Sequence, residues 1–220
     1  MKIDLRLYAL LDPRRANGRD LPSLARLVAD GGATLVQLRD KTGSTRQLIE
    51  EARAIGAALA GTTIPLLIND RVDVALAAEA DGVHIGWDDI GAADARLLLG
   101  RTAIIGLSVK TLQQAAAAPL EHLDYVCIGG VYETLSKDNP DPPIGAEGLR
   151  TIAAAIRKRA PRMPIGAIAG IDQSNVPVTI AAGTDGVAVI SALSMAADPK
   201  AAARNMRAAV DAALSKRGAA

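Results

Sequence analysis

Short apolar runs recur eight times along this chain, and a longer amphipathic stretch separates each run from the next. Most of the runs are continuous rather than alternating in polarity, which is typical of strands buried on both faces in a parallel sheet. The predicted strands cover residues 5–11, 34–38, 65–68, 82–85, 103–107, 125–128, 164–168 and 186–190. Parallel neighbours need a crossover helix between them, so few architectures suit this pattern.

The stretches between the runs carry helix boundary signals. Ser44 followed by Gln47 predicts a capping box, and Asp198 followed by Pro199 predicts a capped helix start. Eight strand–helix units predict an α/β protein, a (β/α)8 TIM barrel that forms one domain over residues 1–220. An open doubly wound sheet is the alternative, although no Gly-x-Gly-x-x-Gly motif follows the first strand.

Composition excludes several classes of protein. Lysine and arginine total 25 against 24 acidic residues, whereas a nucleic-acid binder normally shows a basic excess. No run approaches the ~18 apolar residues of a membrane span, and Asp4 and Arg6 interrupt the start where a signal peptide needs apolar residues. We therefore expect a cytoplasmic protein with no nucleic-acid or membrane partner. The single cysteine, Cys127, is predicted to lie in the core.

Charged side chains gather where the predicted strands end. Their charges are mixed, with Arg39, Lys41 and Lys137 as cations and Asp70, Asp88 and Asp89 as carboxylates. The loops after the strands converge on one face of a barrel and form the active site there. Carboxylates beside cations predict a magnesium–phosphate site. A second phosphate site is expected after the last two strands, where backbone N–H groups near a glycine can bind an anion.

Six segments together resemble the motifs of the thiamine phosphate synthase family. They are residues 37–41, 68–71, 81–86 leading to Asp89, 105–108, 134–137 and 185–191. The resemblance implies a magnesium-dependent transferase of thiamine biosynthesis built on a TIM barrel. Such an enzyme condenses 4-amino-2-methyl-5-pyrimidinylmethyl diphosphate with a thiazole phosphate, and it releases thiamine phosphate and diphosphate. The family's mechanism is regarded as dissociative, so it needs no side-chain nucleophile.

The same resemblance implies roles for thirteen residues. Gln37, Arg39, Lys41 and Asn69 would hold the pyrimidine diphosphate, Asp70 and Asp89 would bind Mg²⁺, and Ser108 and Lys137 would complete the diphosphate pocket as catalytic residues. Thr134, Ser136, Gly170, Ile190 and Ser191 would bind the thiazole phosphate, the last three through backbone groups.

The chain departs from the family pattern at several places near these residues. Ser136 stands where the pattern usually has a threonine and keeps the hydroxyl, and Asp88 stands where it usually has a glutamate. Trp87 replaces the usual glutamine, Lys110 stands where a histidine often follows the serine motif, and Ala169 replaces the first glycine of a Gly-Gly-Ile segment. Trp87 is interpreted as either a lid over the pocket or a plug in it. These departures bear on substrate fit more than on the fold.

Other functions and simpler structural roles stay open at this point. A thiazole tautomerase-like paralogue would lack the metal and diphosphate residues, and a non-catalytic ligand-binding barrel is compatible with the substitutions at Trp87 and Ala169. A homo-oligomer is also open. Taken singly, the residues are also compatible with ordinary structural roles: helix caps for Asp70, Asp88 and Asp89, a solvated rim for Arg39 and Lys41, a charged loop for Arg14, Arg15 and Arg19, and a packed strand end for His84.

Overall fold

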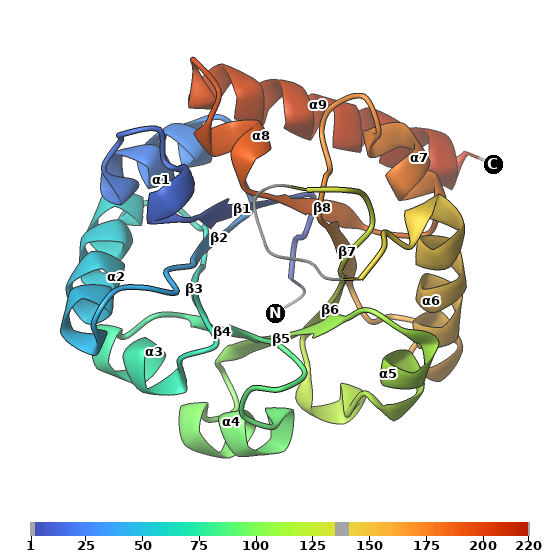
Figure 1. Ribbon diagram of the computed structural model, residues 1–220, viewed down its shortest axis with the longest axis horizontal. Coiled ribbons are helices and arrows are strands. Elements are labelled where there is room, and N and C mark those ends of the chain that lie inside the picture. Colours follow the sequence, from blue (N-terminus) through green and yellow to red (C-terminus); the bar gives the residue numbers. More distant parts are fainter. Residues whose placement is uncertain (1–2, 135–140, 220) are drawn as a thin grey trace.

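Eight parallel strands close into a barrel in the order of the sequence, with β8 returning to pair with β1 (Figure 1). The computed structural model describes residues 3–134 and 141–219. The strands are β1 (Leu7–Leu11), β2 (Leu35–Leu38), β3 (Leu66–Asn69), β4 (Gly82–Ile85), β5 (Ile104–Val109), β6 (Tyr125–Ile128), β7 (Ile165–Ile168) and β8 (Gly186–Val189). The predicted TIM barrel is confirmed, and the open doubly wound alternative is wrong.

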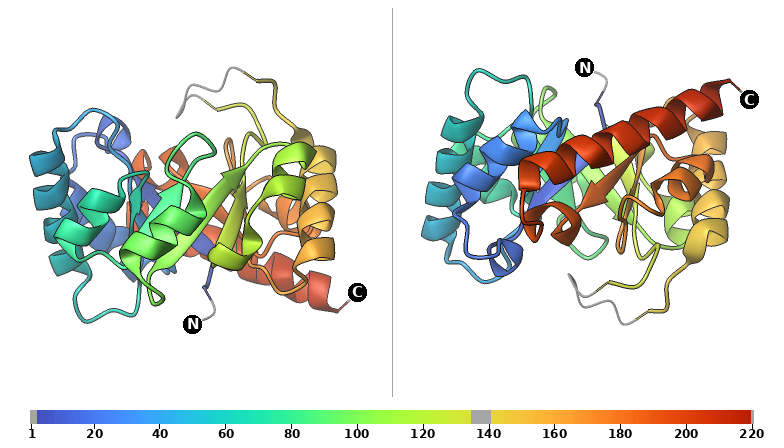
Figure 2. Two further views of the ribbon diagram at one scale, coloured as in Figure 1. Left: turned by 90° about the horizontal axis from the view of Figure 1, so that it is seen from below. Right: turned by 90° about the horizontal axis from the view of Figure 1, so that it is seen from above.

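Helices form the outer layer of the molecule, around the ring of strands (Figures 1 and 2). They are α1 (Leu21–Asp30), α2 (Thr45–Leu59), α3 (Val72–Ala78), α4 (Ala92–Leu99), α5 (Leu112–Ala117), α6 (Gly145–Arg159), α7 (Val176–Ala181), α8 (Ser191–Ser194) and α9 (Pro199–Gly218), with short 3-10 turns at Pro13–Arg15 and Leu120–His122. Among the described residues, no helix combines the length and the apolar character that crossing a membrane requires.

Local sequence explains where these helices start. Ser44 and Gln47 form the predicted capping box at α2, since the Ser44 hydroxyl accepts from the Gln47 N–H at 3.3 Å and the Gln47 side chain accepts from the Ser44 N–H at 2.9 Å. At α9, the Asp198 carboxylate accepts from the Ala201 N–H at 3.0 Å, and Pro199 begins the helix.

Strand residues alternate between the inside of the barrel and the helix layer. The interior set is Leu5, Tyr8, Leu10, Leu35, Leu67, Ile104, Tyr125, Cys127, Ala188 and Ile190. Cys127 is 1% exposed, as expected of a core residue. The outward strand residues pack against the helices in a larger cluster. The barrel is therefore a filled core, and only its ends can admit a ligand.

Four reciprocal contacts, which we call the N-terminal clamps, join the strands in pairs. Each clamp joins the residue directly before an even-numbered strand to one residue of the preceding odd-numbered strand. The side chain of the first residue accepts the backbone N–H of the second, and the backbone N–H of the first donates to the carbonyl of the second. The pairs, with the two distances, are Thr34 with Leu7 (3.1 and 2.8 Å), Asp81 with Leu66 (2.8 and 2.9 Å), Asp124 with Ile105 (2.8 and 2.8 Å) and Asp185 with Ile165 (2.9 and 2.6 Å).

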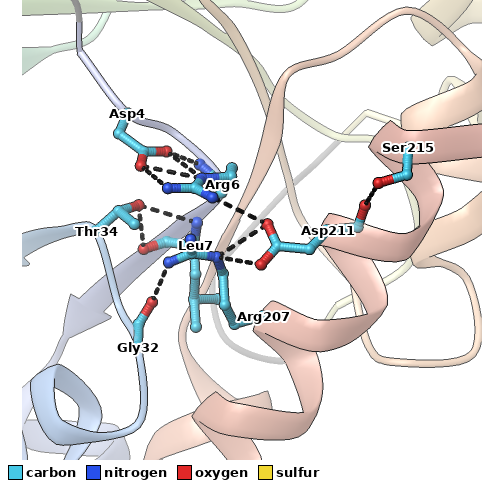
Figure 3. Close-up of polar contacts among 8 residues, drawn as sticks. All are labelled: Asp4, Arg6, Leu7, Gly32, Thr34, Arg207, Asp211 and Ser215. Atoms are coloured by element: carbon cyan, nitrogen blue, oxygen red, sulfur yellow. Dashed lines mark hydrogen bonds and ion pairs between the residues drawn. The ribbon is translucent and has the colours of Figure 1, made fainter. Parts of the chain in front are cut away.

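Figure 3 shows the first of these clamps, where Leu7 meets Thr34 beside α9. Arg207 of α9 donates to the Gly32 carbonyl at 2.9 Å and pairs with Asp211 at 2.9 Å. The start of the chain lies at the opposite end of the barrel from the yellow-green segment that leaves β6 (Figure 2). The clamps therefore lie at the amino-terminal ends of the strands, and this is the end of the barrel opposite the carboxyl termini of the strands.

Candidate active site

A cavity of about 580 Å³ opens at the carboxyl ends of the strands, within the ~300–1,000 Å³ that small-molecule sites usually occupy. Eight of the predicted site residues line it: Gln37, Arg39, Asn69, Ser108, Thr134, Gly170, Ile190 and Ser191. Ser136 and Lys137 lie outside the described residues. Residues far apart in the sequence thus meet in one cavity because all the strands run in the same direction around the ring.

Arg39 follows β2 and is held by a buried carboxylate. Its guanidinium pairs with Asp12, which directly follows β1 and is 3% exposed. The other carboxylate oxygen of Asp12 accepts the Arg14 N–H at 2.9 Å, which fixes the side chain. Only 13% of the Arg39 side chain is exposed, so the solvated-rim interpretation of Arg39 is wrong. A positively charged donor is therefore already oriented at the cavity wall.

Gln37 lies two residues earlier on β2 and is 1% exposed. Its amide Nε2 donates to the hydroxyl of Tyr8 inside the barrel. Its Oε1 is the one buried side-chain oxygen or nitrogen without a hydrogen-bond partner in residues 3–134 and 141–219. A buried acceptor without a partner costs stability, so its presence at a cavity points to a donor supplied by a ligand.

Asp70 and Asp89, the carboxylate pair, are not among the residues that line the cavity, and neither is Lys41; Asp70 directly follows Asn69, which does line it. Lys41 forms an ion pair with Asp70, and the Asp89 carboxylate accepts the Gly86 N–H at 2.6 Å. Asp70 has a left-handed backbone (φ +62°), a conformation that costs energy and often marks functional sites. Burial raises the pKa of Asp70, and the nearby Asp89 carboxyl raises it further, while Lys41 acts in the opposite direction.

Neither carboxylate of this pair caps a helix. The residue that precedes α3 is Arg71, the one that precedes α4 is Gly91, and neither helix start has a side-chain cap bond. The helix-cap interpretation of Asp70 and Asp89 is therefore wrong. Their position is explained by the turns after β3 and β4, which bring both carboxyl groups to one place.

The carboxylate pair fits a magnesium ion. Mg²⁺ takes one or two carboxylates and keeps several waters or phosphate oxygens as its other ligands. The described residues contain no group of three or more His, Cys, Asp or Glu side chains suited to a metal, and a magnesium site does not require one. The Asp89 carboxyl raises the pKa of Asp70 through a side-chain hydrogen bond and through the repulsion of like charges, and a bound divalent cation would relieve that repulsion.

The opposite wall is built by the ends of β7 and β8. Gly170 has a left-handed backbone (φ +64°), and a Cβ there would overlap the Glu133 carbonyl oxygen and lie 2.7 Å from the Tyr132 Cβ. The Tyr132 N–H donates to the Ala169 carbonyl at 3.0 Å, so the segment after β6 packs directly on this turn. Glycine at 170 is therefore a packing requirement as well as a feature of the cavity wall.

Other residues of the site were not found from the sequence. Asp12 was missed, although it directly follows a predicted strand, as the other site residues do. Arg15 was interpreted as part of a solvated loop, but it lines the cavity, as does Lys110. Trp87 is 42% exposed and is not part of the cavity wall, so the plug interpretation is wrong. His84 is packed as expected, at 7% exposed, and its Nε2 lies 2.9 Å from the Ser108 hydroxyl.

Comparisons with known proteins agree over nearly the whole chain. Residues 7–193 match the family model described as thiamine monophosphate synthase. A thiamine-phosphate synthase of Agrobacterium fabrum is 56% identical over 216 residues, with 98% of each chain covered, and one of Xanthobacter autotrophicus is 47% identical, with 96% and 97% covered. A solved thiamine phosphate pyrophosphorylase from Pyrococcus furiosus superposes with a TM-score of 0.85 at 33% identity, with 97% and 98% covered.

Proposed function

Because the chain belongs to the thiamine monophosphate synthase family, we propose that its cavity and its carboxylate pair together hold the two phosphorylated halves of thiamine. The chain is a thiamine-phosphate synthase, a transferase that acts on phosphorylated thiamine precursors. The observation that carries the assignment of residues is that one cavity is lined by described members of both predicted phosphate-binding sets, Gln37, Arg39, Asn69 and Ser108 for the diphosphate and Thr134, Gly170, Ile190 and Ser191 for the thiazole phosphate.

The pyrimidine diphosphate is assigned to the wall formed by β2, β3 and β5. Gln37, Asn69 and Ser108 line this wall, and Arg39 adds an oriented guanidinium. The unpartnered Oε1 of Gln37 suits the 4-amino group of the pyrimidine, because a buried acceptor gains most from an N–H donor. Arg39 and Lys41 would stabilise the departing diphosphate. Lys137, at a position outside the described residues, keeps its proposed catalytic role from the family resemblance.

Asp70 and Asp89 are proposed to hold Mg²⁺. When bound there, the ion would neutralise charge on the diphosphate as that group leaves. Lys41 pairs with Asp70 and so keeps a third charged group next to the proposed position of the diphosphate. The protein's own contribution is to hold these groups in place before the reaction begins, which is how an electrostatic site lowers a barrier.

The thiazole phosphate is assigned to the wall formed by the segment after β6 and the ends of β7 and β8. Thr134, Gly170, Ile190 and Ser191 line this part of the cavity. Ser136 is proposed for the same site on the family resemblance alone. With both substrates in one cavity, the thiazole nitrogen can attack the pyrimidine methylene carbon as the diphosphate departs, and proximity supplies much of the rate. A homo-oligomer and a cytoplasmic location remain predictions.

A synthase assay tests this assignment. Purified protein is incubated with the pyrimidine diphosphate and the thiazole phosphate, with Mg²⁺ or with a chelator, and thiamine phosphate and diphosphate are measured. We expect equal amounts of the two products, and only when both substrates and Mg²⁺ are present. Isomerisation of the thiazole phosphate alone would indicate a tautomerase, and binding of both substrates without turnover would indicate a non-catalytic barrel.

A further inference from the structure

A row of hydrogen bonds crosses the inside of the barrel beneath the cavity, and we call it the interior network. Gln37 Nε2 donates to the Tyr8 hydroxyl. The Tyr8 and Tyr125 hydroxyls are 2.9 Å apart, the Tyr125 hydroxyl is 2.8 Å from His84 Nδ1, and His84 Nε2 is 2.9 Å from the Ser108 hydroxyl. Both ends of the network, Gln37 and Ser108, line the cavity.

The rings of this network are fixed by packing. Tyr125 and Tyr8 meet edge to face, with ring centroids 5.9 Å apart, and Tyr125 stacks on His84 at 5.6 Å. Gly106 stands opposite Tyr125 across the β5–β6 ladder, and a Cβ at this glycine would overlap the Tyr125 ring. The lack of a side chain at Gly106 therefore makes room for the middle of the network.

With the Gln37 amide as the donor at one end, the protons of the network run in one direction. Gln37 donates to the Tyr8 oxygen, so the Tyr8 proton is free to point at Tyr125, and the Tyr125 proton points at His84 Nδ1. Burial raises the pKa of both tyrosines, so both keep that proton. A neutral His84 then carries its proton on Nε2 and donates to Ser108. The Ser108 proton is left to face the cavity.

With a neutral His84, the four hydrogen bonds of the network are also satisfied when all the protons are reversed. In that arrangement Gln37 accepts from Tyr8 through Oε1 and turns its amide N–H₂ toward the cavity. The Ser108 hydroxyl then donates its hydrogen bond to His84 Nε2, so it can only accept a hydrogen bond from a ligand. The network therefore couples its two ends. When Gln37 offers an acceptor to the cavity, Ser108 offers a donor, and when Gln37 offers a donor, Ser108 offers an acceptor.

We propose that Tyr8, Tyr125 and His84 are positioning residues that fix this polarity, so that the site selects a 4-amino pyrimidine over its 4-oxo counterpart. The inference rests on the proposed function. Gln37 meets the amino group as an acceptor, while Ser108 donates to the diphosphate. A 4-oxo ring presents an acceptor at the same place, so it either leaves two acceptors facing each other or forces the whole network to reverse.

The test measures equilibrium binding of the two pyrimidine diphosphates, amino and 4-oxo, by calorimetry with Mg²⁺ and without thiazole phosphate. We expect the unaltered protein to bind the amino compound at least ~10²-fold more tightly, as for other sites that pair with one polar group. In Tyr8→Phe the Gln37 amide loses the partner that orients it, and in Tyr125→Phe the Tyr8 proton is free to turn to Gln37. Both changes should lower this ratio by at least ~10-fold.

Tyr132→Phe is the matched control, because it also removes a tyrosine hydroxyl with a hydrogen bond, here to Thr179 at 3.1 Å, outside the network. The ratio of its affinities for the amino and 4-oxo compounds should equal that of the unaltered protein. A purely structural role would weaken binding of both compounds equally, and unchanged ratios in Tyr8→Phe and Tyr125→Phe would overturn the proposal.

The unaltered protein also provides a test that does not depend on the folding of any variant. Equal affinity for the amino and 4-oxo compounds would overturn the network's role, even if the synthase assay succeeds. Failure of the synthase assay with the amino substrate would instead overturn the proposed function. The two results are therefore distinguishable.

Discussion

Ala169 has a left-handed backbone (φ +93°) that residues with a Cβ rarely adopt, so replacing it with glycine should stabilise the protein. The residue directly follows β7, lines the cavity and precedes Gly170, which has a left-handed backbone of its own. Two consecutive left-handed residues are needed to turn the chain from β7 toward Ile171. Only the second of them is a glycine, so Ala169 stores strain.

The expected gain follows from two opposing contributions. A non-glycine residue in such a conformation costs about 1–3 kcal/mol, and a new glycine costs about 0.5–1 kcal/mol through the extra freedom of the unfolded chain. The net effect for Ala169→Gly is a gain of about 1 kcal/mol in the free energy of unfolding. For a chain of this size, that gain raises Tm by about 2–4 °C.

Thermal and urea unfolding of the purified variant measure this gain. The matched control is Ala160→Gly, at a half-buried alanine that has an ordinary backbone (φ −141°) after α6. This control should lose at least about 0.5–1 kcal/mol, because glycine brings its entropic cost there and removes a methyl group that packs against the core. If Ala169→Gly lost as much stability as Ala160→Gly, the strain argument would be refuted.

Three further predictions concern the site. Asp89→Asn should lower turnover at saturating substrates and Mg²⁺ by at least ~10²-fold, the usual cost of losing one oriented electrostatic contact. Asp88→Asn, at a neighbour that is not part of the carboxylate pair, should leave turnover within a few-fold of that of the unaltered protein. Gly170→Ala should lower Tm strongly because its Cβ would overlap backbone, while Gly129→Ala, whose nearest neighbour would be 3.7 Å away, should not. Trp87→Gln should remain active in the synthase assay, since the indole is not part of the cavity wall; complete loss would contradict that placement.

The strands were predictable because each is a short, continuous apolar run. Several strand boundaries differ from the predicted ones by one or two residues. β5 continues through Ser108 and Val109, since the polar Ser108 still pairs with Cys127 in the ladder. β8 ends one residue earlier than predicted because Ile190 leaves the extended conformation (φ −109°, ψ −85°) to begin α8. Composition shows that a strand exists, but the pairing of its last residues depends on the neighbouring strand.

The position of a cavity-lining residue was predictable where it depends on the end of a single strand, as at Gln37 and Asn69. It was not predictable where it depends on how strands meet. The Tyr8–Tyr125 contact joins residues 117 positions apart, and each tyrosine alone looks like an ordinary strand residue. The Arg39–Asp12 pair likewise depends on β1 and β2 being in register, with Leu11 beside Leu38.

The N-terminal clamps divide the barrel into quarters. Each clamp joins an odd strand to the even strand that follows it, so every one lies within the pairs β1–β2, β3–β4, β5–β6 and β7–β8. A chain cut after β2, β4 or β6 would keep all four clamps inside its fragments, whereas a cut after β1, β3, β5 or β7 would separate the two halves of one. Fragments of the first kind are therefore the ones suited to reassemble into a barrel from separate pieces.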